Sequence, residues 1–229
     1  MYHSVGGGAS DAFTLEPAEF SAQLDWLSAH QFHTITMRQY MDFRDRGAKL
    51  PDHPVAITFD DGFADAYSVA RAALAAHGMV ATFFLVERWV AVDAAHRYAQ
   101  TILGAPRSYV TWDEVRALEA AGNEIGSHSL THRRLSHAAA ATLDEEIGRS
   151  KTLIETELGH PVSAFAFPFN AVSSAARAVV RDAGFRGAVA GDHGMGGAMN
   201  LYRVGIYRGG GTEALSRALG ESWTDAVMR

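Results

Sequence analysis

Short apolar segments alternate with longer segments of helical pattern along this chain. The apolar segments have the length of strands and fall at residues 2–5, 34–36, 54–59, 80–86, 124–127, 162–167, 187–190 and 202–206. Helical patterns occupy residues 17–29, 64–77, 111–121, 138–158 and 173–183, a short helix passes through Tyr40 and Phe43, and a last helix begins at residue 212. This alternation predicts parallel strands with helices packed outside them.

Local signals support several of these boundaries. Pro17 suits the first turn of a helix, and Gly78 suits the end of one. Thr111 precedes Glu114 by three residues, which is the capping-box pattern at the start of a helix. Residues 87–108 follow no regular pattern, and loops of this length in compact domains often face a substrate.

The element order predicts an α/β fold with about seven or eight β/α units and no internal repeat. We expect an irregular or incompletely closed (β/α)7-8 barrel, and a flat doubly wound sheet is the competing architecture. In both, ligands bind beyond the carboxyl ends of the strands. The length of 229 residues favours a single catalytic domain over residues 1–229.

Composition and charge limit the classes of ligand that the protein can bind and bear on its cellular compartment. The net charge of -6, with scattered Lys and Arg, argues against nucleic acid and favours a neutral or cationic small substrate. The absence of Cys excludes disulfides and leaves His and carboxylate as metal ligands. No apolar run approaches the roughly 18 residues of a membrane span, and residues 1–6 lack the pattern of a secretory signal. We therefore expect a cytoplasmic protein, although a trimmed secreted form would look the same.

Two adjacent carboxylates, Asp60 and Asp61, follow the apolar segment 54–59. Two carboxylates at the end of a buried strand are costly to ionise together, so they need a cation or a shared proton nearby. Gly62 permits a tight bend through which both side chains reach one cleft. The structural alternative is that one Asp simply caps the next helix.

His128 and His132 form the second candidate cluster, directly after the segment 124–127. Two His four residues apart in one helical turn project to the same side and can bind one metal. An isolated pair with this spacing is often a surface coincidence. Its place at a predicted strand end, on the same rim as the Asp pair, favours a metal site.

Together these motifs resemble the polysaccharide deacetylase family, also called the NodB-homology or family 4 carbohydrate esterase group. The family motif TFDDG stands unaltered at residues 58–62, and H-[ST]-x-x-H stands at residues 128–132. The resemblance covers the chain from about residue 2 to residue 206. It implies a barrel of the NodB-homology type, with Asp60 as catalytic base and Asp61, His128 and His132 as ligands of one divalent metal, zinc or else nickel, cobalt or iron.

Two departures from the common family pattern bear on the catalytic residues. The motif R-x-P-[YW] corresponds to residues 166–169, so Ala166 replaces the arginine that usually orients the base. The usual late catalytic histidine is missing from residues 201–206. Within the third motif, Pro168 and Phe169 remain the candidate substrate and oxyanion contacts, the latter through a backbone N–H.

One branch of the family, similar to the poly-N-acetylglucosamine deacetylases of biofilm formation, lacks the same arginine and begins with an M-Y-H strand. The sequence Met1-Tyr2-His3 fits this branch, in which the strand-end histidine takes the acid role in a circularly permuted arrangement. The resemblance therefore implies His3 as the general acid. A core or capping role for His3 is the alternative, and His193 is a second candidate for the acid.

The resemblance implies a metal-dependent N-deacetylase that acts on an amino sugar or a glycan containing N-acetylglucosamine. The alternatives are a hydrolase of a small N-acyl or cyclic-amide metabolite and a non-catalytic glycan-binding relative. Trp89, Tyr98 and Trp112 are candidates for stacking on a sugar ring, although aromatic side chains are commonly part of the core. The glycine-rich residues 6–8, 194–197 and 209–211 lack nucleotide-binding patterns and suggest loops. The oligomeric state stays open.

Overall fold

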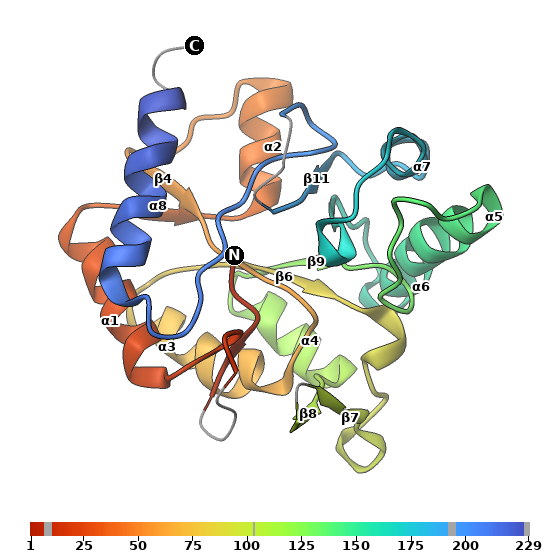
Figure 1. The fold of residues 1–229 in the computed structure, drawn as a ribbon, viewed down its shortest axis with the longest axis horizontal. Helices are drawn as coiled ribbons and strands as arrows, with labels where there is room; N and C mark the ends of the chain where they lie inside the picture. The colour runs from red at the N-terminus through yellow and green to blue at the C-terminus, as the bar shows by residue number, and fades with distance from the viewer. Residues whose placement is uncertain (7–10, 103, 192–195, 227–229) are drawn as a thin grey trace.

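A curled sheet of five parallel strands forms the centre of the molecule (Figure 1). The computed structural model describes residues 1–6, 11–102, 104–191 and 196–226. The strand order is β11-β10-β9-β6-β5. The strands are β5 (Thr58–Phe59), β6 (Thr82–Leu85), β9 (Glu124–Ser127), β10 (Ala164–Ala166) and β11 (Gly187–Val189). Every residue of these strands is buried, including the polar residues Thr58, Thr82, Glu124 and Ser127.

Two short parallel pairs flank the central sheet. They are β1 (Ser4–Val5) with β2 (Thr14–Leu15), and β3 (His33–Ile35) with β4 (Pro54–Ala56). A bridge from Tyr2 to Phe59 attaches the first residues to the edge of the sheet. The predicted α/β class and irregular barrel are confirmed, with an incompletely closed half-barrel in place of a full ring of strands.

Helices cover the outside of this half-barrel (Figure 1). They are α1 (Pro17–Ala29), α2 (Met37–Arg46), α3 (Arg71–Ala76), α4 (Trp112–Ala120), α5 (Ala140–Leu143), α6 (Ser150–Leu158), α7 (Ser174–Asp182) and α8 (Gly211–Ala226). The capping box predicted for α4 is present: Glu114 N donates to Thr111 Oγ1 at 3.3 Å, and Thr111 N donates to the Glu114 carboxylate at 2.9 Å. None of the described helices is long and apolar enough to cross a membrane.

Three predicted segments differ in detail. The helical runs at 64–77 and 138–158 contain the π-helical turns η1 (Ala66–Ala70) and η4 (Asp144–Arg149). The irregular segment 87–108 contains the 3-10 turns η2 (Glu87–Trp89) and η3 (Ala94–His96) and an antiparallel hairpin, β7 (Ala99–Ile102) with β8 (Ala105–Ser108).

The strand predicted at residues 202–206 is wrong. Leu201 forms a bridge to Val189 of β11, but no regular strand follows it. The chain instead turns toward the first residues, where Ile206 N donates to Met1 O at 2.9 Å. A buried arginine, Arg203, lies in this segment and takes part in the site described next.

Candidate active site

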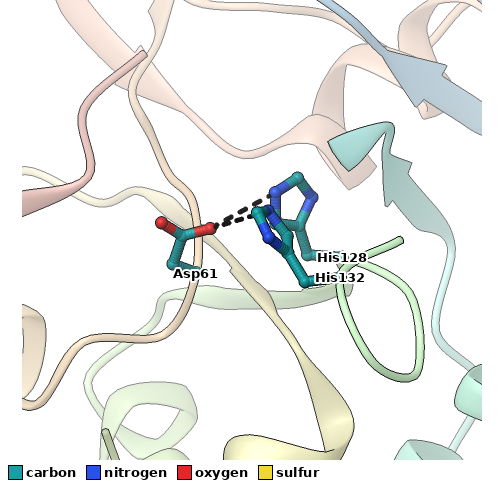
Figure 2. A group of neighbouring side chains, drawn as sticks. All are labelled: Asp61, His128 and His132. Carbon is teal, nitrogen blue, oxygen red and sulfur yellow. Dashed lines mark ion pairs between the residues drawn. The ribbon is translucent and has the colours of Figure 1, made fainter. Parts of the chain in front are cut away.

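Asp61, His128 and His132 meet at the carboxyl edge of the sheet (Figure 2). One ligand atom of each residue lies within 4.8 Å of those of the other two. Asp61 Oδ1 lies 3.5 Å from His128 Nε2 and 3.3 Å from His132 Nε2. The structure therefore brings together the three residues that the sequence suggested as a metal site.

The turn after β5 aims Asp61 at the two histidines. Asp61 has a left-handed backbone with φ 73°, and Gly62 follows with φ 78°. A Cβ at Gly62 would lie 3.1 Å from the Leu85 side chain, so glycine suits this position both in conformation and in space. Adjacent residues of a regular strand point to opposite faces. The turn after β5 instead lets Asp60 and Asp61 face the same cavity.

The electrostatics of the cluster fit a cation. Asp61 Oδ1 is buried and has no hydrogen-bond partner. Burial, with the charge of Asp60, raises the pKa of Asp61 to about 8, and burial, with the charge of His128, lowers the pKa of His132 to about 3. Two neutral imidazoles thus face a carboxylate that is poorly stabilised in its ionised form. One oxygen and two imidazole nitrogens suit a divalent first-row metal.

Backbone contacts orient both imidazoles. His128 is buried, and its Nδ1 lies 2.9 Å from Ala166 O. When Nδ1–H donates to this carbonyl, the Nε2 lone pair faces Asp61. His132 N donates to Ser129 Oγ at 3.0 Å.

The prediction that His128 and His132 share one helical turn is wrong, although their side chains do meet. Residues 128–132 form no helical turn, and both Ser129 and His132 have left-handed backbones, with φ 71° and 62°. A compact loop, in place of a helix face, brings the second imidazole back beside the first.

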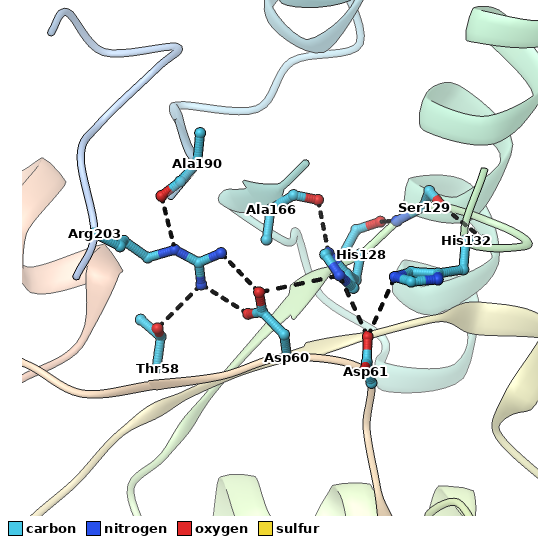
Figure 3. A network of polar contacts seen from close by, with 10 residues as sticks. Thr58, Asp60, Asp61, His128, Ser129, His132, Ala166, Ala190 and Arg203 are labelled. Atoms are coloured by element: carbon cyan, nitrogen blue, oxygen red, sulfur yellow. Dashed lines mark hydrogen bonds and ion pairs between the residues drawn. The ribbon is translucent and has the colours of Figure 1, made fainter. Parts of the chain in front are cut away.

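Asp60 is fixed by Arg203 (Figure 3). The guanidinium donates to both carboxylate oxygens, each at 2.7 Å. It also donates to Thr58 Oγ1 at 3.0 Å and to Ala190 O at 3.2 Å. Burial alone would raise the pKa of Asp60, but the charges of Arg203 and His128 hold it well below its usual range. Asp60 is therefore ionised at neutral pH and rigidly aimed.

Arg203 is the site residue that the sequence did not reveal. Ala166 indeed lacks the orienting side chain of the common family motif, and it contributes its carbonyl to His128 instead. The missing guanidinium arrives from a segment far away in the chain. The available signal was a charged residue inside the apolar run 201–206.

His3 lines the same cavity as the cluster. Tyr2 N donates to Thr58 O at 2.8 Å, and Asp60 N donates to Tyr2 O at 3.0 Å, so His3 follows directly from a residue anchored to β5. Its Nδ1 is buried without a hydrogen-bond partner, and burial lowers the pKa of the ring to about 4. His3 is thus a neutral imidazole that faces the cavity at neutral pH.

The cavity has a volume of about 640 Å³, within the usual range for small-ligand sites. Besides the residues above, its walls include Phe13, Phe63, Trp89, Gln100, Ile102, Arg107, Arg134, Phe167, Phe169, Asn170 and Tyr207. Gln100, Ile102 and Arg107 belong to the hairpin in the segment that we expected to face a substrate.

The remaining candidates lie in different surroundings. Phe169 is 51% exposed, with its ring centroid 4.4 Å from that of His132, whereas Pro168 is buried and does not line the cavity. Trp89 lines the cavity, and Tyr98 packs behind it at 6.1 Å between ring centroids. Trp112 is part of the hydrophobic core, as its alternative interpretation holds. His193 lies outside the described residues, as do Gly7, Gly8, Gly194 and Met195.

The chain belongs to the polysaccharide deacetylase family, whose family model matches residues 47–188. It is 26% identical over 168 residues to the putative polysaccharide deacetylase YxkH of Bacillus subtilis, an alignment covering 73% of this chain and 54% of the relative. It is 29% identical over 84 residues to a poly-β-1,6-N-acetyl-D-glucosamine N-deacetylase of Staphylococcus epidermidis, covering 37% of this chain and 29% of the relative.

The fold is similar to that of the Streptococcus pyogenes deacetylase PplD, solved in complex with acetate. The TM-score is 0.83 at 18% identity, and the match covers 95% of both chains. At this identity the likeness establishes the fold alone. The alignments to the two curated relatives span 54% and 29% of the lengths of those relatives.

Proposed function

We propose that this protein is a metal-dependent N-deacetylase that removes acetyl groups from the amino sugars of a glycan containing N-acetylglucosamine. One observation carries the proposal. The unpartnered Asp61 oxygen faces two imidazole nitrogens, beside an Asp60 carboxylate that Arg203 holds ionised. This arrangement provides a place for a metal and a separate base, and a site that only binds glycans has no need of that base.

Asp61, His128 and His132 would hold one divalent metal, with zinc the first choice and nickel, cobalt or iron as alternatives. When bound, such a metal polarises the acetyl carbonyl and makes water more acidic. The chain supplies the other parts of the reaction.

Asp60 acts as the general base and takes a proton from the attacking water. Arg203 keeps Asp60 ionised and fixes both of its oxygens, so the carboxylate is ready to accept that proton. A backbone N–H near Phe169 stabilises the oxyanion of the tetrahedral intermediate.

His3 delivers a proton to the departing amine. Because the pKa of His3 is about 4, the ring is neutral in the free protein, and it must acquire this proton during the reaction. Asp60 is the source, since it has just accepted one and its charge favours protonation of His3. The C–N bond breaks, the hydroxyl from water completes acetate, and the amino sugar leaves with the relayed proton.

The test compares Asp60→Asn with Asp61→Asn in zinc-loaded protein supplied with β-1,6-linked N-acetylglucosamine oligomers. The wild-type protein releases acetate. Asp60→Asn retains zinc but loses about 10²–10⁴-fold in kcat, because an amide cannot accept the proton of water. Asp61→Asn loses zinc. Equal zinc loss in both variants would show that the roles of the two aspartates are reversed, and no acetate from any N-acetylglucosamine oligomer would refute the proposed substrate.

A further inference from the structure

Arg134 stands at the wall of the catalytic cavity, two residues after His132. Its guanidinium carbon lies 4.5 Å from the centroid of the Phe169 ring. That ring in turn lies 4.4 Å from the ring of His132, so the guanidinium is within about 9 Å of a proposed metal ligand. A charged group on a bound sugar can therefore reach Arg134 while the sugar amide is at the site.

Arg134 differs from the other two arginines near the site in its partners. Arg203 pairs with Asp60, and Arg107 pairs with Asp11. Within the described ranges, Arg134 contacts an aromatic face and has no carboxylate at ion-pair distance. Stacking on a ring holds the guanidinium plane while its N–H edge stays available for a ligand.

The charge balance of the cavity points in the same direction. Asp60 is balanced by Arg203, Asp11 and Asp65 are the carboxylates near Arg107, and a divalent cation held by Asp61 would offset the remaining negative charge. The charge of Arg134 would then be in excess. The cavity thus differs from the whole chain, whose net charge of -6 favoured a neutral or cationic substrate.

We propose that Arg134, seated on Phe169, is a specificity residue that binds an anionic substituent, a carboxylate or a phosphate, on the substrate glycan. This inference rests on the proposed deacetylase function and specifies its substrate class. The planar guanidinium matches both anions because two N–H groups can donate in parallel to two oxygens. The substituent lies on the sugar linked to the one that loses its acetyl group.

The experiment uses zinc-loaded protein and three disaccharides in which N-acetylglucosamine is linked to glucose, to glucuronic acid or to glucose 6-phosphate. Acetate release gives kcat/KM for each substrate. We expect wild-type protein to prefer at least one acidic disaccharide over the neutral one by on the order of 5–10-fold. This preference should decline at about 0.5 M salt, because exposed charges are then screened. Comparison of the two acidic substrates distinguishes carboxylate from phosphate.

The matched variants are Arg134→Gln and Arg133→Gln. Arg133 and Arg134 are both exposed, but only Arg134 lines the cavity. Arg134→Gln should reduce the preference ratio to about one, Arg134→Lys should retain part of it because the charge remains, and Arg133→Gln should keep the wild-type ratio.

The outcomes separate the two proposals. Acetate release without a preference for either acidic disaccharide, or a preference that survives Arg134→Gln, overturns the assignment and leaves the deacetylase function intact. No acetate from any of the three substrates counts against the proposed function. In that case, calorimetric binding of the glucuronic acid disaccharide to zinc-loaded Asp60→Asn, with and without Arg134→Gln, decides on Arg134: equal affinity in the two proteins rejects it.

Discussion

Asp60 and Asp61 are neighbours in the chain but have opposite environments. Two hydrogen bonds from Arg203 stabilise the Asp60 carboxylate and hold its pKa well below the usual range. Asp61 has no such partner, and burial, with the charge of Asp60, raises its pKa to about 8. Environments that separate the pKa values of adjacent acids also separate their roles. The base must be ionised in the free protein, as Asp60 is beside Arg203, whereas a metal ligand becomes ionised when its metal binds.

Replacing Arg203 tests whether the geometry of the base matters beyond its charge. Arg203→Lys keeps a cation near Asp60 but cannot donate two parallel hydrogen bonds. We expect kcat to fall on the order of 10–100-fold, as for changes of orienting residues elsewhere, with zinc content unchanged. Steady-state acetate release and metal analysis measure the two quantities.

Arg208→Lys is the matched control, since Arg208 lies in the same part of the chain, pairs with the half-buried Glu16 and does not contact Asp60. An Arg203→Lys enzyme with wild-type kcat would show that the paired hydrogen bonds from Arg203 to Asp60 are not needed to position the base. Parallel loss of zinc would instead place Arg203 in the support of the metal site.

Replacing His3 tests its assignment as the general acid. Its ring faces the cavity, so His3→Ala should remove the proton donor to the amine and lower kcat by about 10²–10⁴-fold with zinc content unchanged. His193→Ala, at the other candidate, should have little effect. The assignment fails when His3→Ala retains full activity, and the donor is then His193 or water.

At the scale of elements, buried apolar runs located the strands that carry the site. The run at 54–59 ends in the buried strand β5, although its first half forms the separate strand β4 beside β3. The segment before His128 forms β9, which is buried even though it contains Glu124 and Ser127. The segment 201–206 could not be predicted in this way. Its path depends on the Arg203 ion pair and on hydrogen bonds to the first residues, which join positions distant in sequence.

The loop at residues 128–132 shows a second limit of prediction from local sequence pattern. Its spacing identified the correct residues, but its left-handed backbone depends on partners from the helical run at 140–158. Leu130 N donates to Glu146 O at 3.0 Å, and Thr131 N donates to the Glu146 carboxylate at 2.9 Å. Thr131 Oγ1 also donates to this carboxylate. Glu146 lies in the π-helical turn η4, and such turns are frequent at functional sites.

Glu146→Ala therefore tests the support of the loop. The variant loses the carboxylate that holds Thr131, so His132 should be less well placed and zinc affinity should fall about 10–100-fold. Competition with a chromogenic chelator measures that affinity. Glu145→Ala is the control, because Glu145 is the exposed neighbour in the same turn. Equal affinity in the two variants would show that the loop keeps its shape without Glu146.

At the scale of the molecule, the first residues of the chain are joined beside the cavity to the segment that precedes α8. Met1 N donates to Val204 O at 2.8 Å, and Ile206 N donates to Met1 O at 2.9 Å. Figure 1 shows the first residues beside the segment that leads into α8. His3 lies far before Asp60 in the sequence and Arg203 far after it. This contact brings both of them to the same site as Asp60. The order of site residues along the chain is thus secondary to their meeting at one edge of the sheet.

The same assembly predicts how metal removal affects stability. Asp61 follows β5, and both histidines follow β9. Only the folded protein therefore brings the three ligands together, and the metal binds the folded state and not the unfolded chain. Zinc at about 100 times its Kd should then stabilise the fold by about 2.7 kcal/mol, equivalent to about 5–10 °C in Tm for a domain of this size. Thermal unfolding with zinc and with a chelator measures the difference. Asp60→Asn should respond like the wild-type protein, whereas Asp61→Asn should give the same Tm in both conditions. A wild-type Tm that does not change with zinc would contradict a metal site built from these three residues.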